Sequence, residues 1–74
     1  MSAESKKNIV KMAMVYVQEG RWDKAIGEYK KLLTLDPTDY NTHNMLGDVY
    51  KKKGEDALAY QEYIQAAEAH TKQG

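Results

Sequence analysis

The chain has 74 residues, of which 42% are hydrophobic and 30% are charged, and these proportions are typical of one small folded domain. Its 11 basic and 11 acidic residues give a formal net charge of zero, so no long-range field attracts nucleic acid or an anionic membrane. The sequence contains no cysteine, which excludes disulfide bonds and thiolate metal sites. No apolar run approaches the roughly 18 residues of a membrane span, and residues 1–8 lack the apolar centre of a secretory signal. We therefore expect a cytoplasmic protein.

Two helices are predicted in the first half of the chain. The first covers residues 6–19, with Ser5 as its N-cap and Gly20 as its C-terminal stop. Its apolar residues recur at spacings of three and four, as on one helix face: Ile9, Met12, Ala13, Tyr16 and Val17. The second covers residues 22–35 and ends before Pro37, because proline disfavours helical geometry in the residue that precedes it. Its apolar face consists of Ala25, Ile26, Tyr29, Leu32 and Leu33.

Two further helices are predicted in the second half. The third covers residues 40–53, with Asp39 as its N-cap and Gly54 as its stop. The fourth begins near Glu55 and meets no helix-breaking residue until Gly74. Short connections force neighbouring helices to run antiparallel. We therefore expect an all-α fold of two stacked helix–turn–helix hairpins with an extended C-terminal helix.

The chain contains an internal repeat. Sliding the sequence against itself by 34 residues aligns several identical pairs without a gap: Val15 with Val49, Tyr16 with Tyr50, Gly20 with Gly54, Ala25 with Ala59, Glu28 with Glu62, and Tyr29 with Tyr63. This duplication divides the chain into an N-terminal tail (residues 1–5), a first repeat (residues 6–39) and a second repeat (residues 40–73), whose last helix extends towards Gly74.

Small and aromatic residues at fixed offsets within a period of 34 residues resemble the tetratricopeptide repeat (TPR) family. The matching positions are Ala13, Tyr16, Gly20, Ala25, Tyr29 and Pro37 in the first copy, and Leu46, Gly47, Tyr50, Gly54, Ala59 and Tyr63 in the second. The resemblance implies an α-solenoid in which the small residues allow two helix backbones to approach closely. One departure is Thr71, which occupies the position where the second repeat should have a proline.

The extended last helix has two interpretations. It can be a capping helix that covers the last hairpin, as repeat arrays commonly require. Alternatively, Ala66-Ala67-x-x-His70-x-x-x-Gly74 has the spacing of Met12-Ala13-x-x-Tyr16-x-x-x-Gly20, so that the same helix would also begin a third repeat. We favour the second interpretation, in which the chain is a fragment of a longer array, because stable arrays usually need three or more repeats.

In TPR proteins the first helices of successive repeats line a concave groove, and the resemblance transfers ten groove positions to this chain. They are Lys7, Val10, Met14, Val17 and Gln18 in the first copy, and Asn41, Asn44, Asp48, Lys51 and Lys52 in the second. Val10, Met14 and Val17 form an apolar stripe, which is typical of a contact surface if it is exposed. The alternative is that the N-terminal tail, the last helix or a second copy packs against this stripe.

No group of residues predicts catalysis, a cofactor or a metal site. The chain has neither a cysteine nucleophile nor a glycine-rich loop that opens a helix after a strand, and His43 and His70 lie far apart in sequence. We therefore expect a scaffold module and not an enzyme, with a protein or peptide partner in the groove. The alternative is self-association, as a homodimer or by exchange of the last helix between copies.

Overall fold

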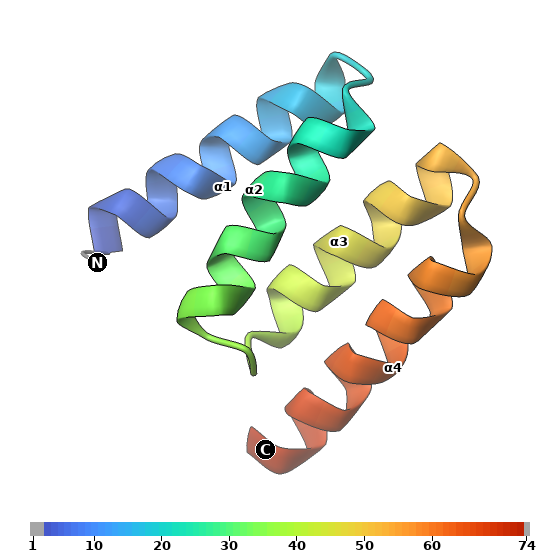
Figure 1. Ribbon diagram of the computed structural model, residues 1–74. Helices are drawn as coiled ribbons and strands as arrows, with labels where there is room; N and C mark the ends of the chain where they lie inside the picture. The colour runs from blue at the N-terminus through green and yellow to red at the C-terminus, as the bar shows by residue number, and fades with distance from the viewer. Residues whose placement is uncertain (1–2, 74) are drawn as a thin grey trace.

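The computed structural model describes residues 3–73 and contains four helices within them, with no strand (Figure 1). Their bounds are Ala3–Gln18 for α1, Trp22–Leu35 for α2, Tyr40–Lys53 for α3 and Asp56–Gln73 for α4. Each helix packs against the next one along the chain, so the four lie in a row, with α1 and α4 at its two ends (Figure 1). The slab measures 34 × 32 × 15 Å. This arrangement confirms the all-α fold of two helical hairpins.

The helix bounds agree with the predicted ones to within one residue, except at the start of α1. The bounds of α2 and α3 are those expected, and α4 begins at Asp56. The first helix starts at Ala3, so that Ser5 lies inside it and is not its N-cap, and residues 3–5 of the expected tail are helical. Alanine has the highest helix propensity of all residues, and nothing before Ser5 breaks the pattern. Residues 1–2 and Gly74 lie outside the described residues.

The predicted caps at Asp39, Gly20 and Gly54 are confirmed. The side chain of Asp39 accepts a hydrogen bond from the backbone N–H of Thr42 at 3.3 Å, which satisfies one of the unpaired donors at the start of α3. Gly20 and Gly54 follow α1 and α3 with φ values of 74° and 92°. This left-handed conformation costs little only for glycine. The N–H of Glu55 then donates to the Tyr50 carbonyl at 2.9 Å, which closes the last turn of α3.

The core lies along the contacts between successive helices. Ala13 and Ala25 are completely buried, and their small side chains let α1 and α2 approach closely. Gly47 was also expected to lie where two helix backbones approach closely. Instead, a Cβ atom at Gly47 would lie 2.7 Å from Cε1 of the Tyr63 side chain, and not against another backbone. The tyrosine ring of α4 therefore fills the space that the glycine of α3 leaves. Leu32 of α2 is 1% exposed and belongs to the hydrophobic core that contains Ala13 and Ala25.

His43 joins α3 to α4 and to the connection that precedes α3. Its Nδ1 lies 2.8 Å from Oε1 of Glu62, and its Nε2 lies 2.8 Å from the carbonyl oxygen of Pro37. Burial by itself lowers the pKa of His43, but the hydrogen bonds to Glu62 and Pro37 and the charges of Glu62 and Asp39 outweigh burial and raise the pKa above 6.5. Folding therefore makes the ring easier to protonate, and the protonated ring can donate from both nitrogens.

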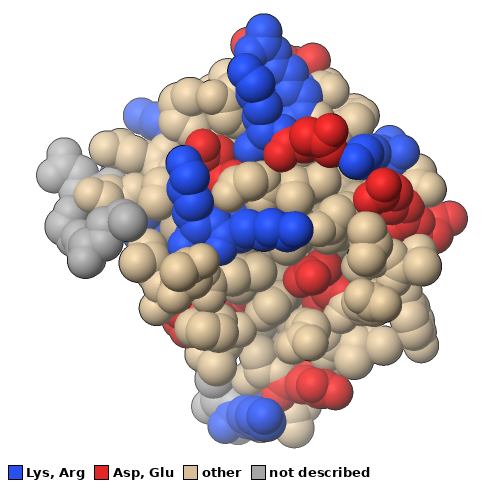
Figure 2. All heavy atoms as spheres, viewed as in Figure 1, with Lys and Arg blue, Asp and Glu red and all other residues tan. Residues whose placement is uncertain are grey.

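The surface carries charges of both signs. In the view of Figure 2, basic and acidic side chains are interspersed, and both kinds gather in the upper half of this face. An ion pair connects α3 to α2, with Nζ of Lys53 2.7 Å from Oδ1 of Asp23. None of the helices in residues 3–73 combines the length and the apolarity that crossing a membrane requires.

Candidate functional site

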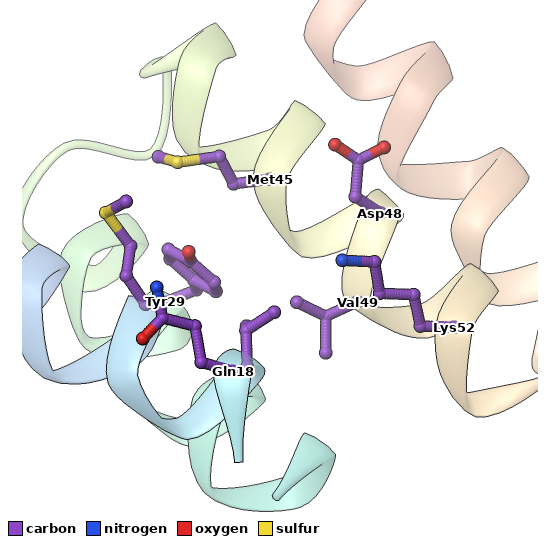
Figure 3. Close-up of a pocket in the computed structure, with 8 residues that line it drawn as sticks. Gln18, Tyr29, Met45, Asp48, Val49 and Lys52 are labelled. Atoms are coloured by element: carbon purple, nitrogen blue, oxygen red, sulfur yellow. The ribbon is translucent and has the colours of Figure 1, made fainter. Parts of the chain in front are cut away.

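A hollow of about 260 Å³ lies between α1 and α3 and has α2 at its base (Figure 3). Its lining consists of Met14, Val17 and Gln18 from α1, Tyr29 from α2, and Met45, Asp48, Val49 and Lys52 from α3. The α3 residues are spaced by three, one and three positions, and this spacing places all four on one face of the helix. The two hairpins together therefore build the hollow, and neither could form it alone.

The inside of the hollow is apolar and its rim is polar. Tyr29 and Val49 are 3% and 2% exposed, so the base is fixed by the core. Met14 is 51% exposed and Met45 is half-buried, and the flexible thioether chains of such methionines can adapt to different partners. The rim carries the amide of Gln18, the carboxylate of Asp48 and the ammonium group of Lys52, which are labelled in Figure 3.

The carboxylate of Asp48 is anchored by a tyrosine from the neighbouring helix. The hydroxyl of Tyr63 donates to Oδ1 of Asp48 at 2.5 Å. This hydrogen bond, together with burial and the negative charge of Asp48, raises the pKa of Tyr63 to about 12. Burial and the same negative charge also raise the pKa of Tyr29. Asp48 therefore brings a carboxylate that is held in place by a hydrogen bond to the polar rim of the hollow.

Comparison with known protein families identifies the repeat. A family model described as a TPR repeat matches residues 13–54, which is more than half of the chain, and one described as a tetratricopeptide repeat matches residues 40–70. The chain belongs to the tetratricopeptide repeat family. No curated protein matches it. TPR repeats are generally protein–protein interaction modules, and the TPR fold is typically a non-enzymatic scaffold.

The structure brings together five of the ten residues that the TPR resemblance assigned to the groove. They are Met14, Val17, Gln18, Asp48 and Lys52. Val10 lies outside the hollow and packs, half-buried, against the core. Val17 is also half-buried in this way, so only Met14 of the expected apolar stripe is mainly exposed.

The remaining predicted residues are distributed over other parts of the TPR surface. Asn44 lines a second hollow, between α3 and α4, beside Tyr40 and His70. Lys7, Asn41 and Lys51 are exposed and lie outside the hollow between α1 and α3.

Three lining residues were not among the predicted groove positions of the TPR repeats. Tyr29 was assigned to the repeat framework, and Val49 appeared as the repeat counterpart of Val15. Both are buried, and each also lines the base of the hollow. Met45 carried a usable signal, because it lies three residues before Asp48 and seven before Lys52 and therefore shares their helix face.

Proposed function

We propose that this TPR chain is an interaction module that binds a segment of a partner protein in the hollow between α1 and α3. The observation that supports the proposal is the combination of an apolar interior, lined by Met14 and Met45, with a polar rim. Binding sites commonly combine an apolar cavity with a few polar groups that set the orientation of the ligand. The expected scaffold function and the expected groove both lead to this proposal.

The lining indicates the chemistry of the bound segment. An apolar side chain of the partner would insert between Met14 and Met45 and cover Val49 at the base. Asp48 and Lys52 lie one helical turn apart, so a segment with a basic and an acidic residue flanking the apolar one would find an opposite charge for each. Since Tyr63 already holds the Asp48 carboxylate, the basic residue would meet a group that loses little freedom on binding.

A random-peptide phage library, selected against the folded chain, tests the proposal. We expect the selected peptides to carry an apolar residue between charged ones, and to shift the backbone amide signals of Gln18, Asp48 and Lys52 in NMR spectra. Met14→Lys removes an apolar contact from the hollow. Because fully burying one such side chain contributes about 1.5–3 kcal/mol, the variant should bind about ten- to a hundredfold more weakly.

Met12→Lys is the matched control, because it makes the same change at an exposed methionine of α1 that does not line the hollow. We expect this variant to bind the selected peptides as tightly as the unmodified chain. If no peptide is selected, or if Met12→Lys weakens binding while Met14→Lys does not, the hollow between α1 and α3 is not the binding site.

A further inference from the structure

Residues that are equivalent in the two repeats differ in burial. In α3, Leu46 is 1% exposed and Val49 is 2% exposed, whereas their counterparts in α1, Met12 and Val15, are 44% and 38% exposed. Among the described helices, α3 packs extensively against both α2 and α4, whereas the extensive contact of α1 is with α2. The additional neighbour of α3 is α2, so Met12 and Val15 mark the face of α1 that corresponds to the α2-covered face of α3.

The last helix shows the complementary difference. Ile26 of α2 is 8% exposed, but its counterpart in α4, Tyr60, is 68% exposed. Similarly, Leu33 is half-buried and packs against the core, whereas its counterpart Ala67 is exposed. In residues 3–73, α2 has both α1 and α3 as packing neighbours, and α4 has α3. Tyr60 and Ala67 therefore mark the face of α4 that corresponds to the α3-covered face of α2.

The contact between α2 and α3 has two halves, and each has an equivalent at one end of the chain. The Met12 and Val15 face of α1 is equivalent to the α3 half, and the Tyr60 and Ala67 face of α4 is equivalent to the α2 half. We propose that a second copy of this chain covers them, with α1 of one copy packed on α4 of the next as α3 packs on α2. Figure 1 shows α1 and α4 at opposite ends of the row of helices, so the contact would extend the row. This proposal concerns the ends of the slab and does not depend on the hollow between α1 and α3.

The side chains support a second copy as the occupant. Met12 and Val15 are apolar like the Leu46 and Val49 that they replace. On the other face, Tyr60 is larger than Ile26 and Ala67 is smaller than Leu33, so the two volume changes partly offset each other, as well-tolerated core substitutions do. These four residues therefore keep the apolar character of the residues that they replace.

One feature of the internal contact is missing from the proposed one. The ion pair between Lys53 and Asp23 connects α3 to α2, but the equivalent residues in α1 and α4 are Glu19 and Ala57, which cannot form a pair. We therefore expect weaker packing between copies than within the chain, and association only at high protein concentration. Because the contact is head-to-tail, it can continue from copy to copy and has no built-in stopping point.

Sedimentation velocity across a concentration series tests the proposal with two variants. Met12→Lys disrupts the face of α1, and Tyr60→Lys disrupts the face of α4. We expect the average mass of the unmodified chain to rise with concentration without reaching a fixed stoichiometry, and each variant alone to keep the monomer mass. An equimolar mixture of the two variants should form a dimer of twice the monomer mass, because one intact face of each kind remains.

Matched controls make the same changes outside the proposed contact. Met14→Lys and Gln61→Lys alter exposed positions whose counterparts in the other repeat, Asp48 and Gly27, are also exposed. These variants should associate like the unmodified chain. Circular dichroism verifies that all variants are folded, and if Tyr60→Lys is not, Ala67→Lys replaces it.

Several results would overturn the proposal. A monomer at every concentration would mean that another occupant, such as a further hairpin of a longer chain, covers these faces. A dimer that persists in Met12→Lys or in Tyr60→Lys alone would show that identical faces pair symmetrically. A mixture that stays monomeric, or a loss of association in Met14→Lys, would show that α1 does not pack on α4 in the proposed way.

Discussion

The contact between Gly47 and Tyr63 predicts that one substitution, glycine to alanine, has opposite effects at two helical positions. At Gly47 the added Cβ atom would lie 2.7 Å from Cε1 of Tyr63, which is 0.7 Å closer than the 3.4 Å at which ordinary van der Waals contact begins. The ring is half-buried, and its hydroxyl is bonded to Asp48, so moving it disturbs both its packing and this hydrogen bond. At Gly27 the added atom would meet nothing within 4 Å.

The magnitudes follow from two opposing effects. Alanine is about 1 kcal/mol more favourable than glycine in a helix interior, and this gain applies at both positions. Overpacking typically costs about 1–3 kcal/mol, and this loss applies at Gly47 alone. We therefore expect Gly27→Ala to stabilise the chain by about 1 kcal/mol and Gly47→Ala to destabilise it by about 1 kcal/mol. Each should shift the melting temperature by roughly 4–8 °C, in opposite directions.

Urea and thermal unfolding of dilute protein, followed by far-UV circular dichroism, measure both effects. The double variant Gly47→Ala/Tyr63→Ala should relieve the clash, so that Gly47→Ala becomes stabilising in the Tyr63→Ala background. Equal stabilisation by Gly27→Ala and Gly47→Ala would refute the reasoning, because it would show that the ring of Tyr63 moves aside without cost.

Two further predictions concern protonation. Since the pKa of His43 is raised in the folded chain, the contribution of this side chain to stability should be fully present below pH 6.5 and decrease as the pH rises through the folded-state pKa. NMR titration of the ring should show a pKa above 6.5 that falls in the Glu62→Gln variant. A pKa below 6.5 in the unmodified chain would contradict the prediction. Tyr63 should ionise with a pKa of about 12 because of its hydrogen bond to Asp48. The Asp48→Asn variant should move the pKa of Tyr63 back towards 10.0, as NMR or ultraviolet titration would show. An unchanged Tyr63 pKa in that variant would rule out the hydrogen bond as the main cause.

The sequence alone determined the helices and their order. Helix ends depend on a few neighbouring residues, and the signals at Asp39, Gly54 and Pro37 were sufficient to place α2 and α3 at their observed bounds. The 34-residue repeat then indicated two hairpins of the TPR family, because equivalent residues at equivalent spacings form equivalent elements. The start of α1 was misplaced because Ser5 is a favourable N-cap residue but equally fits within a helix that begins earlier.

Only the tertiary structure decided which residues share a site and which are covered. The sequence could not show that His43 lies between Pro37 and Glu62, because the side chain of Glu62 approaches only when α4 packs on α3. Nor could it separate Met12 from Leu46, which occupy equivalent repeat positions but are 44% and 1% exposed. A repeat specifies the same local structure twice, whereas burial depends on how many neighbouring helices pack against each copy.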